Sequence, residues 1–371
     1  MKYRWWRYPI ALALLPALTG WLIYDITWHP AEQEQLPVSC NNRDAAPALL
    51  IPGQALKVMT WNIQYLAGKR YVFWYDMPDS DGPDERPTPE DIAYNLDEVA
   101  RVIRDEQPDI VLLQEVADGA KNADYTDQLA LLKARVTDLL PCSTEAFDWK
   151  PDFIADRPIV GSVGMKLATL SRYRIDKAER LQLPVSGGNL ISRSFAPKPA
   201  LLVSYLPMRG GGRLVIANTR FVNTHKDRGA LKHQVNATAQ WLDQWEHSGD
   251  PWLAGGDFDL LAQGQYLRLP EAQRGQYLAD SELHVIWDKH PMIPSLEDVA
   301  GSERRTWLTR FPNDPRISGP DRTQDYLFYS PALRRVDARV RLADTLLISD
   351  HLPLLARFIL PGTPDSGSTE R

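Results

Sequence analysis

The sequence predicts an α/β fold in which two β-sheets pack together and helices cover their outer faces. Two observations lead to this fold class: predicted strands and helices alternate from Leu56 onward, and the strands outnumber the helices. The chain has 371 residues, 44% of them hydrophobic and 24% charged, which is typical of a globular protein with a sizeable core.

Three amphipathic helices are expected. The first begins at Thr88, an N-cap residue followed by Pro89, and ends before Pro108. Its apolar face carries Ile92, Leu96, Val99 and Ile103. The second covers residues 126–140, and the third presents Leu231, Val235, Thr238, Leu242 and Trp245 on one face.

Short apolar runs between these helices predict the strands. They lie at residues 58–63, 110–113, 163–170, 201–206, 214–222, 252–253, 326–329, 338–342 and 353–358.

The first 29 residues are predicted to be a signal anchor or a signal peptide. Lys2, Arg4 and Arg7 precede an apolar run at residues 9–24, which is short for a membrane-spanning helix. Basic residues at the N-terminal end keep that end inside and send the rest of the chain across the membrane. We therefore expect a membrane-anchored protein whose folded domain faces the extracytoplasmic (periplasmic) side, or a secreted protein after signal cleavage.

Residues 30–55 are rich in Pro, Asn and Ala and are expected to form a linker, and residues 362–371 a disordered tail. The folded domain then covers residues 56–361. The chain has two cysteines, Cys40 and Cys142, which could form a disulfide in an oxidising compartment or remain as two thiols.

The net charge of −6 bears on the class of ligand. Phosphate contacts dominate the affinity of proteins for DNA, so an acidic chain is not expected to bind duplexes tightly and without specificity. Nucleic acid remains possible as a substrate.

Polar residues follow or precede the predicted strands at six places. Each has an ordinary explanation alone: a solvated strand end, a turn after Gly-Gly, or a structural histidine. Together they indicate a functional site at one edge of the sheets. The six segments are Thr60-Trp61-Asn62, Gln114-Glu115, Asn223-Thr224-His225, residues 255–259 (Gly-Gly-Asp-Phe-Asp), Gln324-Asp325-Tyr326 and Ser349-Asp350-His351.

In this order, and with Leu170-Ser171-Arg172-Tyr173 between them, these motifs resemble the endonuclease/exonuclease/phosphatase superfamily. That superfamily includes pancreatic deoxyribonuclease, inositol polyphosphate 5-phosphatases and neutral sphingomyelinases. The resemblance covers residues 56–361 and implies a four-layer α/β sandwich of two mostly antiparallel sheets with outer helices. It also implies that this domain is catalytic and hydrolyses phosphoester bonds with a divalent metal ion.

The resemblance assigns a metal site to three residues. Glu115 is the main ligand, Asn62 supports the metal or the phosphate, and Asp350 contributes. Mg²⁺ (or Mn²⁺) suits such a site because it prefers oxygen ligands and is typically held by one or two carboxylates.

The resemblance assigns the chemistry to four further residues. Asp257 orients or deprotonates the attacking water, and His225 and His351 contact the phosphoryl group. Asp325 holds one of the two histidines in its tautomer, and the sequence does not indicate which.

Asp259 departs from the family pattern, which has Asn after Gly-Asp-Phe. Asn can donate a hydrogen bond to the transition state, and an ionised Asp cannot. A like charge about 4 Å away costs roughly 4 kcal/mol at an effective dielectric near 20. Three interpretations remain: Asp259 is protonated, it binds a second metal ion, or the protein is a weakened enzyme that binds a phosphorylated partner or lipid.

Two residues are candidates for substrate binding. Trp74 belongs to an aromatic run at residues 71–76 that is followed by an acidic, Pro-rich stretch and could form a lip over the site or simply cover a sheet edge. Arg172 matches a motif position, although a surface arginine is the simpler interpretation. A lipid or small phosphoester is favoured as substrate over extracellular nucleic acid, and a monomer is expected.

Overall fold

Two sheets form the body of the protein in the computed structural model, which describes residues 7–41, 46–77, 79, 81–155, 159–185, 188–222 and 228–362, without the side chains of residues 7–15 and 228. Within these residues each sheet has seven strands. Sheet I has the order β1 (Gln33–Leu36), β7 (Lys177–Gln182), β8 (Ala200–Pro207), β9 (Arg213–Arg220), β10 (Trp252–Asp257), β12 (Asp325–Tyr329) and β11 (Met292–Ile293).

Sheet II has the order β13 (Arg334–Val340), β14 (Leu354–Ile359), β3 (Ala55–Asn62), β4 (Ile110–Ala117), β6 (Met165–Ser171), β5 (Cys142–Trp149) and β2 (Val38–Cys40). Neighbouring strands are antiparallel, except that β9 pairs with β10 and β3 pairs with β4 in parallel. The prediction of mostly antiparallel sheets is therefore confirmed.

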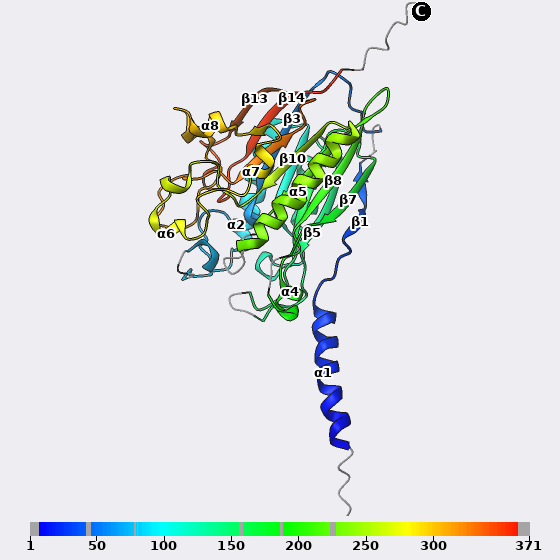
Figure 1. Ribbon diagram of the computed structural model, residues 1–371, viewed down its shortest axis with the longest axis vertical. Helices are drawn as coiled ribbons and strands as arrows, with labels where there is room; N and C mark the ends of the chain where they lie inside the picture. Colours follow the sequence, from blue (N-terminus) through cyan, green and yellow to red (C-terminus); the bar gives the residue numbers. More distant parts are fainter. Residues whose placement is uncertain are drawn as a thin grey trace, which may run out of the picture.

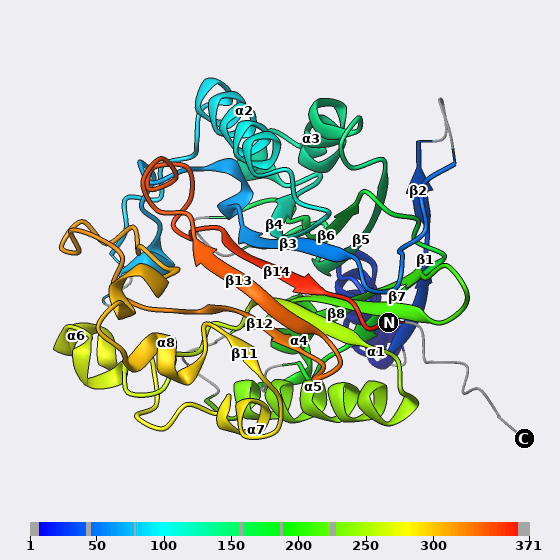
Figure 2. The same cartoon turned by 90° about the horizontal axis from the view of Figure 1, so that it is seen from above.

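Helices cover the outer face of each sheet, which gives four layers (Figure 2). The helices α2 (Pro89–Glu106) and α3 (Gln128–Val136) pack on sheet II, and α5 (Arg228–Ser248) and α7 (His284–Trp287) pack on sheet I. A third apolar cluster fills the space between the sheets and includes Val58, Leu112, Ile216, Leu253, Leu327 and Phe358. The predicted four-layer α/β sandwich is confirmed.

The local sequence explains how α2 forms. The Thr88 side chain accepts a hydrogen bond from the Asp91 backbone N–H, and Pro89 occupies the first turn, as predicted. The helix ends at Glu106, and the C-cap residue Gln107 has a left-handed backbone with φ of 46°. The four apolar residues predicted for the inner face of this helix are all buried.

Shorter helices complete the fold. They are α4 (Leu190–Phe195), α6 (Glu271–Arg274), α8 (Leu296–Ala300) and the 3₁₀ helices Gln64–Leu66, Trp74–Asp76, Lys121–Ala123, Tyr266–Arg268 and Arg304–Trp307.

The N-terminal residues form a helix over the segment that was predicted to be a signal anchor or signal peptide. This helix, α1 (Arg7–Ile26), contains Pro16 and Asp25 and projects from the two sheets (Figure 1). Within the part of the chain that the structure describes, no helix combines the length and apolar character needed to cross a bilayer. The predicted tail, apart from residue 362, lies outside the described residues.

The segment predicted as a linker, residues 30–55, instead adds an edge strand to each sheet. Strand β1 pairs with β7, and β2 pairs with β5. Gln33 and Gln35 donate side-chain hydrogen bonds to the Glu179 carboxylate, and a disulfide joins Cys40 to Cys142. The linker prediction was wrong because side-chain hydrogen bonds and a disulfide to distant residues hold this polar segment in place. The composition of the segment does not reveal such contacts.

The two parallel strand pairs bring the polar strand ends to one edge of the sandwich. Asn62 at the end of β3 is in register with Gln114 of β4, and Asp257 at the end of β10 is in register with both Arg220 and Asp325. Because β14 is antiparallel to β3, with Leu354 opposite Thr60, the residues before β14 reach the same edge.

Two glycines allow β10 to run through the middle of the sandwich. A Cβ on Gly255 would lie 2.9 Å from Leu112 Cδ1 on the facing sheet and 2.4 Å from Leu327 Cδ2 on the neighbouring strand. A Cβ on Gly256, whose φ is 151°, would lie 1.9 Å from the Thr219 carbonyl oxygen. Close backbone approach therefore requires glycine at position 256, and leucine side chains from the facing sheet and the neighbouring strand fill the space at Gly255.

Candidate active site

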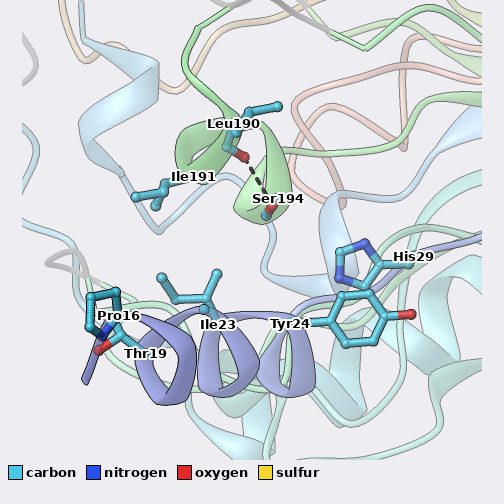
Figure 3. Close-up of a pocket in the computed structure, with 9 residues that line it drawn as sticks. Pro16, Thr19, Ile23, Tyr24, His29, Leu190, Ile191 and Ser194 are labelled. Atoms are coloured by element: carbon cyan, nitrogen blue, oxygen red, sulfur yellow. Dashed lines mark hydrogen bonds between the residues drawn. The ribbon is translucent and has the colours of Figure 1, made fainter. Parts of the chain in front are cut away.

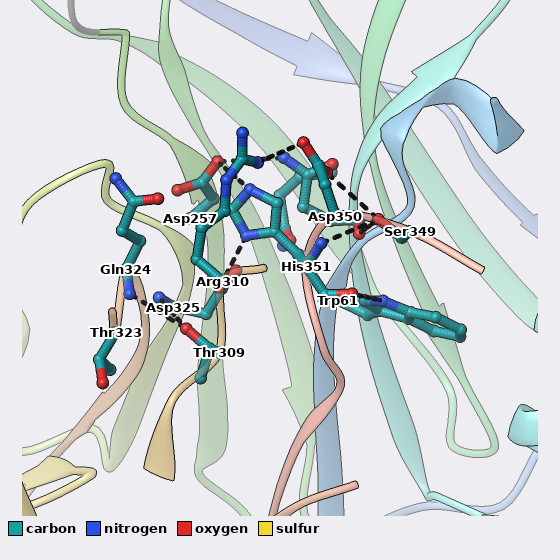
Figure 4. Close-up of polar contacts among 12 residues, drawn as sticks. Trp61, Asp257, Thr309, Arg310, Thr323, Gln324, Asp325, Ser349, Asp350 and His351 are labelled. Atoms are coloured by element: carbon teal, nitrogen blue, oxygen red, sulfur yellow. Dashed lines mark hydrogen bonds and ion pairs between the residues drawn. The ribbon is translucent and has the colours of Figure 1, made fainter. Parts of the chain in front are cut away.

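The centre of the site is a chain of three buried groups in which the His351 ring lies between Asp325 and Asp257 (Figure 4). His351 Nδ1 lies 2.8 Å from Asp325 Oδ2, and His351 Nε2 lies 3.6 Å from Asp257 Oδ2. Thr309 Oγ1 accepts a hydrogen bond from the Asp325 backbone N–H, which fixes the start of β12. His351 is thus the histidine that pairs with Asp325, a choice that the sequence left open.

The charge on His351 follows from this pairing. Burial disfavours the charged ring, but the carboxylates of Asp325 and Asp257 outweigh it and raise the pKa of His351 to about 9. The imidazolium therefore persists at neutral pH, with Nε2–H directed toward Asp257 and available to a phosphoryl oxygen.

Asn62 orients Asp257. Its Nδ2 donates a hydrogen bond to Asp257 Oδ2 at 3.0 Å, and its own Oδ1 accepts from the Gln64 backbone N–H at 2.9 Å. The second Asp257 oxygen accepts from the backbone N–H of Asp259 at 3.0 Å. Both Asp257 oxygens are therefore held, and the predicted role of Asn62 as a metal support remains a prediction.

Asp259 has a protonation state unlike that of an ordinary aspartate. Burial and the nearby Asp257 carboxylate raise the pKa of Asp259 to about 7. Its Oδ1 accepts a hydrogen bond from Gln324 Nε2 at 2.6 Å. A carboxyl group that still carries its proton near neutral pH can donate a hydrogen bond, as the family's Asn would.

Glu115 lies at a β-bulge where β4 and β6 change register, and its own backbone has φ of 55°. The bulge turns the side chain toward sheet I, where its Oε1 lies 2.9 Å from Arg220 Nε. Arg220 also contacts Asp148 Oδ2 through a terminal nitrogen at 2.9 Å. The arginine thereby fixes the carboxylate that the sequence predicts as the main metal ligand.

Asp350, the other predicted carboxylate ligand, contacts a second arginine. Its Oδ2 lies 2.7 Å from a terminal nitrogen of Arg310. Sequence reasoning missed both arginines. Arg220 ends an apolar strand, and Glu115 follows the apolar run at residues 110–113, so that signal was present, but Arg310 lies in an irregular segment without a motif.

The donor set suits a divalent cation. Ligand atoms of Asp257, Asp325 and His351 lie within 4.8 Å of one another and form a buried group that could hold a metal ion. Because Asp325 already engages His351 Nδ1, the carboxylate oxygens of the predicted ligands Glu115 and Asp350 are the better match to an oxygen-preferring ion. The carboxylates outnumber the arginines around them, and a cation would offset this excess negative charge.

Three predicted residues remain to be placed. Arg172 is not part of the site: its Nε lies 3.2 Å from Asp109 Oδ1, and Ser171 is in register with Ile110, at the end of β4 opposite to Glu115. Strand β6 runs antiparallel to β4, so a residue that follows β6 leaves the site edge. His225 lies outside the described residues.

The aromatic run at residues 71–76 was predicted either to cover a sheet edge or to form a lip over the site, and its residues differ in burial. Tyr71 and Phe73 are buried and cover the sheet edge, whereas Trp74 and Tyr75 are 38% and 40% exposed. The Tyr75 hydroxyl lies 2.5 Å from that of Tyr65, which follows Asn62 on the site edge. A substrate contact by Trp74 remains a prediction.

The two packed sheets with outer helices and a polar site at one edge define a class of α/β sandwich proteins, and sequence comparison identifies the family. The model of the endonuclease/exonuclease/phosphatase family matches residues 59–351. The chain therefore belongs to the endonuclease/exonuclease/phosphatase family, as its motifs predicted. No curated protein matches the chain by sequence.

Solved structures share the fold. An endonuclease/exonuclease/phosphatase from Beutenbergia cavernae is 21% identical, with a TM-score of 0.55 over 84% of this chain and 73% of that one. The human Nocturnin catalytic domain with a bound sulfate anion is 17% identical, with a TM-score of 0.51 over 87% of this chain and 96% of that one. At these identities the likeness establishes the fold alone.

Proposed function

We propose that the protein is a divalent-metal-dependent hydrolase of phosphodiesters. The Asp325–His351–Asp257 chain carries this proposal, because it places an imidazolium and a carboxylate side by side at the edge where Glu115 and Asp350 also lie. The coarser conclusion, a phosphoester-cleaving hydrolase, follows already from the family.

Each residue has a defined task in this proposal. Asp257, held by Asn62, orients the attacking water and accepts its proton. His351 donates a hydrogen bond from Nε2 to a phosphoryl oxygen, and Asp325 keeps the ring protonated and oriented. Glu115 and Asp350 would hold Mg²⁺ or Mn²⁺, which would polarise the phosphoryl group.

The substrate class follows from charge and surroundings. The chain is acidic, with a net charge of −6, and exposes Trp74 and Tyr75 on the loop near the site. Both features favour a lipid or small phosphodiester over long nucleic acid. The sulfate bound to the Nocturnin domain has the same tetrahedral oxyanion shape as a phosphate.

Attachment to a membrane through the N-terminal segment is part of the proposal. Side chains of α1 and α4 are exposed around one groove (Figure 3): Tyr24 is 64% exposed, and Leu190 and Ile191 are 84% and 56% exposed. Such side chains favour contact with a lipid surface. The basic residues Lys2, Arg4 and Arg7 favour the extracytoplasmic side for the folded domain. Flotation of the full chain with phosphatidylglycerol vesicles tests this proposal, and failure of the protein to float would contradict it.

A panel of substrates tests the reaction. Plasmid DNA, short oligonucleotides, sphingomyelin and bis-p-nitrophenyl phosphate are each incubated with Mg²⁺, Mn²⁺ or EDTA. Metal-dependent turnover of at least one substrate is expected, and turnover of lipid alone would establish the substrate class. Absence of turnover throughout would instead favour the alternative, a weakened family member that binds phosphate or lipid, for which Asp259 is the motivating departure.

A further inference from the structure

Arg310 lies beside the His351 centre although no motif marks it (Figure 4). Its backbone forms an isolated bridge with His351, and its side chain is 18% exposed. One terminal nitrogen lies 2.7 Å from Asp350 Oδ2, and the other lies 3.9 Å from Asp76 Oδ1. Asp76 belongs to the aromatic loop after β3, so two distant parts of the chain flank one guanidinium.

Further contacts fasten this loop to the segment that carries Arg310. Lys69 Nζ donates hydrogen bonds to the carbonyl oxygens of Phe311 and Pro312 at 2.7 and 2.6 Å. Asn313 Nδ2 donates to the Tyr71 carbonyl oxygen at 2.8 Å. Arg310 is therefore held from both its backbone and its side chain, which reduces the entropy lost when it binds a ligand.

The guanidinium retains donors for a ligand. Arginine has five N–H donors in a planar fork. Among the contacts of the described residues, Asp350 alone is within hydrogen-bonding distance of the Arg310 guanidinium, because the 3.9 Å separation from Asp76 is too long for a hydrogen bond. The Asp76 Oδ1 atom is itself buried without a hydrogen-bond partner in the described part of the chain. Asp76 thus lies beside the Arg310 guanidinium without occupying its donors.

The guanidinium also lies near the reacting groups. Its positive charge opposes the rise in the pKa of Asp259 and opposes protonation of His351. It contacts the carboxylate of Asp350, the residue before His351, so it lies at the same edge as the His351–Asp257 pair.

We propose that Arg310 binds the non-bridging oxygens of the substrate phosphate, and that Asp76 and Asp350 position its guanidinium for this contact. The planar fork matches two oxygens of a tetrahedral phosphate, which a lysine ammonium cannot do. This inference rests on the proposed phosphodiester hydrolase function and assigns the anion-binding group of that site.

The experiment measures binding of inorganic phosphate by titration calorimetry, together with kcat and KM for bis-p-nitrophenyl phosphate. The variants are Arg310→Lys, Arg310→Ala and Asp76→Asn. Arg213→Ala is the control, because Arg213 begins β9 at the other end of the strand, is about half exposed, forms an ion pair with Asp250 at 2.9 Å and lies over the Tyr205 ring.

Loss of a charge-assisted hydrogen bond predicts phosphate affinity on the order of 10- to 100-fold weaker in both Arg310 variants. Asp76→Asn should raise KM more than it lowers kcat, because it displaces the binding group and leaves the His351 centre intact. The control should bind phosphate within about twofold of the wild type, as expected for a surface ion pair. Wild-type phosphate affinity in Arg310→Lys, which keeps the charge and the fold, would overturn the inference.

Two outcomes separate this inference from the proposed function. Arg310-dependent phosphate binding by a wild-type protein that turns over no substrate would support the inference and contradict the function. Metal-dependent turnover whose KM is the same in the wild type and in Arg310→Lys would support the function and contradict the inference.

Discussion

Replacement of Asp259 by asparagine should increase activity above neutral pH. Burial and Asp257 raise the pKa of Asp259 to about 7, so the carboxyl group loses its proton as the pH passes through that value. With this pKa, the protonated fraction is about one half at pH 7 and about one tenth at pH 8. Because the ionised form cannot donate a hydrogen bond and repels the phosphate, kcat/KM of the wild type should fall accordingly.

Asparagine donates at every pH, so the variant should exceed the wild type by about twofold at pH 7 and about tenfold at pH 8. The assay is kcat/KM for bis-p-nitrophenyl phosphate from pH 5 to 9 at saturating Mg²⁺. Asp176→Asn is the matched control, since Asp176 pairs with Arg174 and is 43% exposed. A variant that is equally or less active than the wild type across this range would refute the reasoning and indicate that ionised Asp259 is required, as for a metal ligand.

The same substitution should stabilise the metal-free protein in a pH-dependent way. The pKa of Asp259 is 3.8 in the unfolded chain and about 7 in the folded protein. Ionisation of this group therefore leaves the free energy of unfolding unchanged below pH 4 and lowers it by the full amount above pH 7. The penalty is at most on the order of 4 kcal/mol. Denaturant unfolding in EDTA should show Asp259→Asn more stable at pH 8 and equal to the wild type below pH 4; a pH-independent difference would contradict this cause.

Three further substitutions probe the site and the fold. Glu115→Gln keeps an acceptor for Arg220 but loses charge, so the Mg²⁺ concentration for half-maximal turnover should rise on the order of 10- to 100-fold, and an unchanged metal titration would exclude Glu115 as a ligand. Asp325→Asn should lower kcat on the order of 100- to 10,000-fold, because His351 loses the carboxylate that keeps it charged; unaltered kcat would remove His351 from the mechanism. Cys40→Ser should lower the free energy of unfolding by about 4 kcal/mol, because the disulfide closes a loop of 102 residues, and no loss in urea unfolding would contradict a structural role.

The sequence predicted the fold and the centre of the site because both depend on local signals. Hydrophobic periodicity and the Thr88 cap determine α2, and polar residues directly after apolar strands mark Asn62, Glu115 and Asp257. Parallel strand pairing then brings these ends to one edge, a consequence of topology that the family resemblance also implies.

The remaining features depend on contacts between distant residues. Asp350 and the loop around Asp76 position the Arg310 side chain at the site. No motif near Arg310 in the sequence indicates these contacts. Strand β1 forms because sheet I offers it an open edge at β7, although its own residues are mostly polar. Arg172 shows the reverse case: it matches a motif position in the sequence, but antiparallel pairing of its strand places it at the far end of the sheet from the site.

Turnover of bis-p-nitrophenyl phosphate by the wild type and by Asp257→Asn, each freed of metal and then titrated with Mg²⁺, tests the central claim most directly. Asparagine at this position can still accept from Asn62 but cannot take a proton from water. We expect wild-type turnover to rise with Mg²⁺ and that of the variant to stay at least about 100-fold lower at every concentration. Equal turnover by the two proteins would contradict a reaction that depends on this carboxylate.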